Sequence, residues 1–390
     1  MPTLSVFSSG NLKLKAHVEC YKNNKKLRFL TTENNGQAEL KPDVDTIVVH
    51  PLGSCWSMLK PVNDKDLDCI CPEIRPEHMN WWHQTMGVSS PSICENIAIG
   101  VIDTGFLGHK NIPSLVYHSK HSDTPLKEDS HGSQIVRLIT NGANGFENGL
   151  LSDVKIHFFD AKLNASSSLA RGVTFPTEKL DENLVIEGID YLSGVVGVDL
   201  INLSAGCKEA VEPEVLTEAI KTAELRGCLV IAATGNEGHY EASLPARLPE
   251  VVGVGGVGVS NIAPRGTYVD LMQGNAEADN QVGSVSGVGE FFVHARSCRS
   301  KGLDVIAPSI GVTLTMSTGY VTDIEGTSFG CPMVTSVLAK KLDQDQVYLE
   351  ASAERRAQRA RAVLQGMCRD VGFNKNDQGM GIPMLEGRAK

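Results

Sequence analysis

Three polar residues of complementary chemistry stand where apolar runs end or helices are expected to begin. Asp103 ends the run IAIGVID, His131 opens the stretch HGSQIVRLI, and Ser328 lies within IEGTSFGCPMV. A serine hydroxyl is a weak nucleophile at neutral pH and needs a base beside it. Histidine has a suitable pKa for that base, and a buried carboxylate can fix its tautomer. The three types together indicate a candidate site for acyl transfer.

Two further stretches carry residues that such a reaction would use. Asn236 follows the apolar run LVIAATG, and its side-chain amide could donate to the oxyanion of a tetrahedral intermediate. The backbone N–H of Ser328, at an expected helix N-terminus, would be the second donor. The run DLINLSAG ends with Ser204, Ala205 and Gly206, which places these residues at another strand exit.

Each of these residues also has a simpler interpretation. Ser328 and His131 could cap helices, Asp103 could form an Asx turn, and Asn236 could belong to a turn with Gly235. These features would then have to arise independently at four places in the chain. Their joint occurrence favours the catalytic interpretation.

The composition limits the class of protein. The chain has 390 residues, of which 41% are hydrophobic and 21% charged, which is enough for one large domain and a small one. Its net charge of -10 argues against a nucleic-acid partner. The first twenty residues lack a basic region followed by an apolar core, and no apolar run is long enough to span a membrane. We therefore expect a cytoplasmic protein without a membrane partner.

The cysteines are scattered and favour free thiols in a reducing compartment. They are Cys20, Cys55, Cys69, Cys71, Cys94, Cys207, Cys228, Cys298, Cys331 and Cys368. Cys69 and Cys71, with Cys55 nearby, could suggest zinc, but their spacing is unusual and no matching second pair follows. Calcium is conceivable, yet no cluster of Asp and Asn has convincing spacing. We expect no metal and no cofactor.

From about Ile97 the pattern predicts an α/β fold. Short and almost continuous apolar runs are typical of strands buried on both faces of a parallel sheet. Helical patterns cover residues 131–139, 182–193 and 212–226. The alternation indicates a doubly wound, mostly parallel sheet, in which functional sites form outside the carboxyl ends of the strands.

The earlier part of the chain predicts β structure. Residues 1–60 are expected to form a small all-β, sandwich-like accessory domain, with strands in LKLKAHVEC, QAEL and DTIVVHP. Residues 61–95 are expected to be a linker or docking segment, with Trp81 to His83 as the anchor. Residues 96–390 would be the catalytic domain. Its irregular segments 164–183 and 273–302 are expected to border the cleft.

Several motifs together resemble the subtilisin-like serine proteases (subtilases). VIDTG, HGSQIV and GTSFGCPMV are similar to that family's aspartate, histidine and serine motifs, in the family's chain order. AATGNEG resembles its asparagine segment, and LPARLPEVVGVGGV and LDVIAPS resemble framework stretches. The resemblance extends over residues 97–385, where AVLQGMCRDVGFNKNDQGMGIPML looks like the family's closing helix and strand.

The resemblance implies a role for each matching position. Ser328 would be the nucleophile, His131 the general base and acid, Asp103 the orienting carboxylate and Asn236 the oxyanion donor. The strand at residues 204–206 would pair with an extended substrate and border the pocket for the residue before the cut.

The serine motif departs from the family at three positions. Cys331-Pro332-Met333 stands where the family usually has Ser-Pro-His, and Phe329 stands where many members have methionine. None of these changes touches the three catalytic residues. Cys331 is expected to be a packing residue because no second base is evident for a catalytic thiol.

These observations predict an intracellular serine endopeptidase whose substrates are restricted, as for a processing or regulatory protease. The alternative is a non-catalytic module that keeps the fold to bind a peptide strand. The N-terminal β unit could bind a protein partner, regulate the cleft or be a divergent inhibitor-like domain. We expect that it is not cleaved off, because no processing site of small residues stands out.

Overall fold

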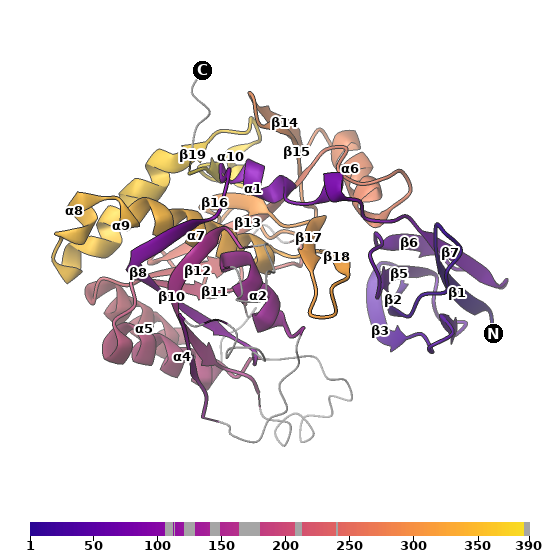
Figure 1. The fold of residues 1–390 in the computed structure, drawn as a ribbon, viewed down its shortest axis with the longest axis horizontal. Coiled ribbons are helices and arrows are strands. Elements are labelled where there is room, and N and C mark those ends of the chain that lie inside the picture. The colour runs from indigo at the N-terminus through magenta and orange to yellow at the C-terminus, as the bar shows by residue number, and fades with distance from the viewer. Residues whose placement is uncertain are drawn as a thin grey trace.

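The chain folds into an α/β body with a small β domain at one end, next to α6 (Tyr268–Ala278) and the hairpin of β17 (Val312–Thr315) and β18 (Val321–Ile324) (Figure 1). The computed structural model describes residues 1–105, 112, 114–120, 129–140, 149–163, 180–206, 213–238 and 241–385. Within these ranges no helix combines the length and the apolar character that crossing a membrane requires.

The central element is a nine-stranded mixed sheet in the order β14-β15-β13-β12-β11-β8-β10-β9, with β16 also paired to β13. β14 and β15 join it antiparallel, and the other described pairings are parallel. The strands are β8 (Ser92–Asp103), β9 (Leu115–His118), β10 (Leu151–Asp160), β11 (Leu200–Leu203), β12 (Leu229–Ala233), β13 (Val251–Val259), β14 (Val282–Val285), β15 (Gly289–Val293) and β16 (Val305–Pro308).

Apolar side chains cover both faces of this sheet. Along β12, Leu229 and Ile231 pack into one core cluster, and Val230 packs into the other. Successive side chains of a strand point to opposite faces, so each cluster lies on its own side of the sheet. The first cluster includes residues of α2 (His131–Ile139), α7 (Thr327–Asp343) and α9 (Ala353–Met367); the second includes residues of α4 (Glu182–Asp190) and α5 (Pro213–Leu225). Helices therefore cover both faces of the sheet, as the sequence predicts for a doubly wound fold.

Helix α7 lies at the centre of this arrangement and contacts β8, β11, β12, β13 and β16. The remaining elements of this part of the chain are short. They are η1 (Pro76–His78), α1 (Trp81–Thr85), the π-helical turn η3 (Tyr191–Val196), α6 (Tyr268–Ala278), β17 (Val312–Thr315), β18 (Val321–Ile324), α8 (Gln346–Leu349), β19 (Cys368–Arg369), α10 (Lys375–Gln378) and β20 (Ile382–Pro383).

The N-terminal region consists of two sheets around one apolar cluster. β4 (Gln37–Glu39), β1 (Thr3–Ser8) and β7 (Leu67–Cys71) form one sheet; β3 (Lys25–Thr31), β2 (Ala16–Lys22), β5 (Thr46–Pro51) and β6 (Met58–Pro61) form the other. The expected end of this domain at residue 60 is therefore too early. β7 pairs in parallel with β1, so residues 67–71 belong to the β domain and not to a linker.

The expectation of irregular structure at residues 273–302 is also wrong for part of that segment. It contains the end of α6 and the antiparallel pair β14–β15, which extends the edge of the main sheet. Valine and phenylalanine around a glycine turn provide this pairing. Most of the other expected loop, 164–183, lies outside the described residues.

The β domain packs against the α/β body through an apolar and a polar contact. Trp56 is fully buried in a cluster with Tyr268 and Phe292, among others. Beside it, the backbone N–H and the hydroxyl of Ser57 both donate to Oδ1 of Asp323 in β18, at 3.0 and 2.8 Å.

The indole nitrogens of the segment after the β domain bind backbone carbonyls at the start of β17. Trp81 Nε1 donates to the carbonyl of Gly311 at 3.0 Å, and Trp82 Nε1 donates to the carbonyl of Thr313 at 3.3 Å. Both rings are buried. These contacts fix the segment to the α/β body; its role as a docking anchor between the two parts stays a prediction.

We expect Asp323→Asn to be at least as stable as the wild type at pH 7.5 and to lose this advantage on acidification. Burial raises the pKa of Asp323 to about 6, against the opposing hydrogen bonds from Ser57. In the unfolded chain an aspartate titrates near pH 4, so the native state binds this proton more tightly. Protonation of Asp323 therefore stabilises the folded wild type fully below about pH 4, and this contribution is lost as the pH rises through about 6. At about 1.4 kcal/mol per pKa unit, the difference between the free energies of unfolding of the two proteins should change by roughly 3 kcal/mol over this pH range.

Urea unfolding of both proteins between pH 4 and 7.5 would measure this difference. His50 lies in the same contact, and burial lowers its pKa to about 4, so its own contribution decreases on acidification. That effect is common to both proteins and cancels in the comparison. Parallel stability profiles for the two proteins would contradict the prediction.

Candidate active site

Asp103 is buried at the end of the strand β8. This strand lies between β10 and β11, and its last five residues are all buried. The carboxylate Oδ1 accepts a hydrogen bond from the backbone N–H of Thr104 at 2.7 Å. A carboxylate fixed in this way can hold one orientation toward a partner at the carboxyl edge of the sheet.

His131 begins α2 and is that partner. Its Nδ1 lies 2.8 Å from Oδ1 and 3.0 Å from Oδ2 of Asp103. Ser130 caps the helix by accepting from the N–H of Ser133 at 3.2 Å, which fixes where the imidazole leaves the backbone. Gly132 permits the close approach, because a Cβ there would lie 2.3 Å from the carbonyl oxygen of Thr104.

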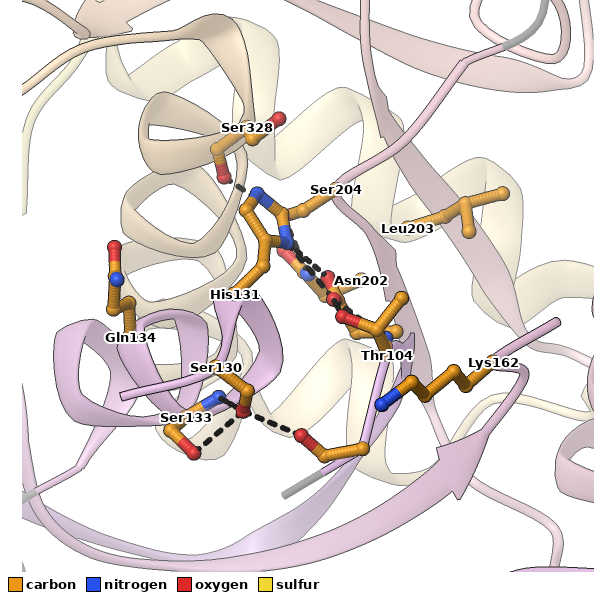
Figure 2. A network of polar contacts seen from close by, with 12 residues as sticks. Thr104, Ser130, His131, Ser133, Gln134, Lys162, Asn202, Leu203, Ser204 and Ser328 are labelled. Atoms are coloured by element: carbon orange, nitrogen blue, oxygen red, sulfur yellow. Dashed lines mark hydrogen bonds and ion pairs between the residues drawn. The ribbon is translucent and has the colours of Figure 1, made fainter. Parts of the chain in front are cut away.

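Ser328 is the second residue of α7, and its side chain points toward the His131 ring in Figure 2. The next residue, Phe329, packs with its ring 5.6 Å from the imidazole ring. Asp103 contacts one nitrogen of the imidazole, and the hydroxyl of Ser328 faces the ring from α7. The structure thus brings together the three residues that the sequence analysis singled out.

The proline inside α7 has a direct consequence for Ser328. Pro332 lacks an N–H, so it cannot donate to the carbonyl of residue 328, four positions earlier. The hydroxyl of Ser204 donates to that carbonyl instead, at 2.8 Å. Ser204 in turn accepts from the amide of Asn202 at 2.9 Å. The first turn of α7 is therefore tied to the end of β11.

The side chain of Asn236 is anchored by the residue before Ser328. Its Oδ1 accepts from the N–H of Thr327 at 2.8 Å and is 3.1 Å from the Thr327 hydroxyl. Because the oxygen is engaged in this way, the NH₂ group remains as the donor. Gly326 has φ +136°, and a Cβ there would lie 3.2 Å from Nδ2 of Asn236. A glycine at this position suits both the backbone and the approach of the amide.

We expect Asn236→Ala to lower kcat by about 10²- to 10³-fold with little change in KM, because an oxyanion donor acts on the transition state. The alanine variant also removes the acceptor of the Thr327 N–H. Asn236→Asp is the matched control, since it keeps an acceptor there but donates nothing. Steady-state kinetics on a peptide substrate should show a loss at least as large for the aspartate variant. Retained activity in Asn236→Asp would mean that anchoring Thr327 is the whole role of this side chain.

Residues 204–206, the strand end predicted to bind substrate, differ in their exposure to solvent. Ser204 is buried, and its hydroxyl holds the carbonyl of Ser328. Ala205 is partly exposed and Gly206 is exposed. A Cβ on Gly206 would lie 2.8 Å from Cβ of Ser243. Pairing of this strand with a substrate backbone stays a prediction.

Sequence reasoning missed several residues that support the site. Asn202 is a fully buried amide that also accepts from Thr335 of α7, at 3.3 Å. Asp129 binds the N–H and the hydroxyl of Ser317 at 2.9 and 2.7 Å, just ahead of His131 in the chain. Burial opposes ionisation of this carboxyl, but hydrogen bonds from Ser317 and Arg137 hold the pKa of Asp129 below its usual value. The only sequence signal for Asn202 was that it is the one polar residue within the apolar run LINL.

The thiol of Cys331 is fully buried and packs near the carbonyls of Leu203 and Ile231. Burial raises the pKa of Cys331 well above its usual range, as expected for a packing residue. The sulfurs of Cys69 and Cys71 lie 3.9 Å apart within the β domain. In the described part of the chain, no three histidine, cysteine or acidic side chains are arranged to hold a metal ion.

Comparison with known proteins agrees with this geometry. A sequence model of the subtilase family matches residues 95–381. The chain belongs to the subtilase family. Membership assigns it to the serine endopeptidases and confirms the resemblance seen in the sequence motifs.

Individual relatives of this subtilase are distant. The major intracellular serine protease of Bacillus subtilis is 27% identical over 282 residues, covering 66% of this chain and 75% of that protein. The minor extracellular protease Epr of the same species is 23% identical over 300 residues; the match covers 76% of this chain but only 38% of Epr. The solved structure of the prenylagaramide maturation protease PagA has a TM-score of 0.51 at 20% identity, and the match covers 80% of this chain and 96% of PagA. At that identity the likeness shows the fold alone.

Proposed function

We propose that this subtilase cleaves peptide bonds through an acyl-enzyme formed on Ser328. The observation that carries the proposal is the position of His131. Its Nδ1 is 2.8 Å from a buried carboxylate, and the side chain of Ser328 points toward its ring (Figure 2). A buried carboxylate, an imidazole and an alcohol in this order are the components of a serine hydrolase.

The reaction follows from these positions. His131 takes the proton of Ser328 as Oγ attacks the substrate carbonyl, and Asp103 stabilises the imidazolium that forms. Asn236 and the N–H of Ser328 donate to the oxyanion. His131 then gives its proton to the leaving amine. Water attacks the acyl-enzyme in the second half of the reaction, with His131 again as the base.

The substrate would be a protein or peptide bound as an extended strand. The exposed end of β11, at Ala205 and Gly206, offers backbone groups for such pairing. We propose a cytoplasmic enzyme with restricted substrates, because an unrestricted protease would damage the proteins around it. The free and mostly buried cysteines suit a reducing compartment. One relative is itself named an intracellular serine protease.

Labelling with a fluorophosphonate tests the proposal. The serine oxygen displaces fluoride from phosphorus, so one equivalent of reagent should attach to Ser328 and abolish hydrolysis of a peptide library to the same extent. Mass spectrometry of a digest would locate the label. A label on another residue would reject the assignment of Ser328. Absence of any label on a well-folded protein would favour the non-catalytic peptide-binding module.

A further inference from the structure

The β17–β18 hairpin connects the N-terminal β domain with the candidate active site. One end of β18 is held because the N–H of Val321 donates to the hydroxyl of Ser54 at 3.1 Å. The other end is held because Asp323 accepts both donors of Ser57. The loop between β5 and β6 thus binds β18 at two points.

The contact at Asp323 is a directed chain of hydrogen bonds. The hydroxyl of Ser57 gives its single proton to Asp323, so it can only accept from Nδ1 of His50, 3.0 Å away. Burial lowers the pKa of His50 to about 4, which keeps the ring neutral with one N–H for this bond. Because Ser57 and Asp323 are buried and His50, which is half-buried, is engaged with them, this chain of hydrogen bonds tolerates little displacement.

β18 continues directly into the residues that carry the reaction. Glu325 follows the strand and forms an ion pair with Arg296 at 2.6 Å. The N–H of Gly326 then donates to the carbonyl of Ser309 at 2.7 Å. The N–H of Thr327 donates to Asn236, and Ser328 is next in the chain. A shift at the end of β18 would therefore move the nucleophile and the anchor of the oxyanion donor together.

The turn of the same hairpin reaches the base. Ser317, between the two strands, donates twice to Asp129, two residues before His131. Arg137 of α2 holds the same carboxylate at 2.7 Å. The hairpin is therefore linked to residues that hold Ser328, Asn236 and His131 in place.

We propose that the N-terminal β domain is a positioning domain of the active site, in which Ser57 holds β18 so that Ser328 and Asn236 keep their reactive geometry. The inference rests on the proposed function of Ser328. Ser57 and Asp323 are positioning residues: the described side-chain hydrogen bonds of both are with the hairpin and the β domain, and the carbonyl of Ser57 accepts from the N–H of Tyr268 at 2.9 Å. The domain then acts on the chemical step, and not by covering the cleft.

The first test compares Ser57→Ala with Thr32→Val. Ser57→Ala removes the central hydroxyl and leaves the backbone donor in place. Thr32→Val is the matched control, because Thr32 is equally buried in the β domain and accepts only within it from the N–H of Ala16, at 2.8 Å, among its described bonds. We expect Ser57→Ala to lower kcat and the rate of fluorophosphonate labelling by about 10-fold, with KM within twofold, since small displacements of reacting groups are costly. Thr32→Val should lower Tm but leave kcat within twofold.

The second test uses a conservative pair at the other end of the bond. Asp323→Asn keeps an oxygen that accepts from Ser57, whereas Asp323→Ala does not. We expect the asparagine variant to retain most of the wild-type kcat at pH 7.5 and the alanine variant to lose about 10-fold or more. If Asp323 contributes only to stability, Asp323→Ala will have a changed Tm. The two variants will then have the same kcat at a temperature where both are folded.

The outcomes separate this inference from the proposed function. If the wild type neither labels nor hydrolyses peptides, the proposed function fails. If the wild type is active and Ser57→Ala, folded by circular dichroism, has the same kcat and labelling rate, the positioning role is overturned. Equal losses of kcat in Ser57→Ala and Thr32→Val would also overturn it, because general loosening of the β domain would then explain both.

Discussion

Replacing Ser328 with alanine is expected to lower kcat for peptide hydrolysis by about 10⁴- to 10⁶-fold, because without the oxygen no acyl-enzyme forms. The change deletes one atom from a partly exposed side chain and keeps the carbonyl that Ser204 binds. Tm should therefore stay close to the wild-type value. Active-site titration and steady-state kinetics on one peptide, at matched protein concentrations, measure the loss.

Ser336→Ala is the matched control for this experiment. Ser336 lies on the same helix α7 and is fully buried, and its hydroxyl donates to the carbonyl of Pro332 at 2.7 Å. This variant should keep kcat within a few-fold of the wild type. More than a hundredth of the wild-type activity in pure Ser328→Ala protein would show that another group is the nucleophile.

Asp103→Asn should lower kcat by about 10⁴-fold at neutral pH while the protein stays folded. An asparagine of the same shape can present its NH₂ to Nδ1 of His131, which would then carry no proton. The other ring nitrogen would hold the proton, and His131 could no longer take one from Ser328. The expected signature is a fall in kcat/KM that follows the fall in kcat, since the lost interaction belongs to the transition state.

Asp160→Asn offers a close comparison. Asp160 ends β10, lies directly opposite Asp103 in the register of the sheet, and is also buried. Its carboxylate binds the hydroxyl of Tyr117 at 2.7 Å and the N–H of Lys162 at 3.0 Å. The same substitution there should affect stability more than catalysis. Comparable losses of kcat in both variants would mean that the charge of this sheet edge matters, and not the contact between Asp103 and His131.

The contact between Asp103 and His131 could be anticipated because it depends on local patterns. The run IAIGVID reads as a buried strand, and the helix expected at residues 131–139 is α2 as observed. Parallel strands bring their carboxyl ends to one edge of a sheet. Asp103 lies at such an end and His131 begins a helix, so the sequence could predict that the two side chains meet at this edge.

The support of Ser328 by Ser204 could not be anticipated in the same way. The sequence shows that Pro332 frees a carbonyl in α7, but not which donor replaces the missing N–H. Ser204 lies 124 positions earlier in the chain, and only the packing of α7 across β11 brings the two together. Asn202 was missed for the same reason, since it also accepts from Thr335 of α7, 133 positions away in the chain.

The bounds and pairing of the strands in the β domain were the features that the sequence predicted least well. Alternation from Leu12 predicted a strand there, yet Leu12 is exposed and β2 begins at Ala16. The pairing of β7 with β1 joins residues more than sixty positions apart. Neither a turn motif nor a local period signals such a contact, so the sequence predicts a linker after residue 60.

The burial of Trp56 between the β domain and the α/β body bears on how this protein could respond to a protease. A nick in the chain between β7 and α1 would cut the covalent link but leave that indole and the Ser57–Asp323 bonds in place. The severed fragment would remain bound like a small obligate subunit. Control by excision of this module is thus disfavoured by the fold itself.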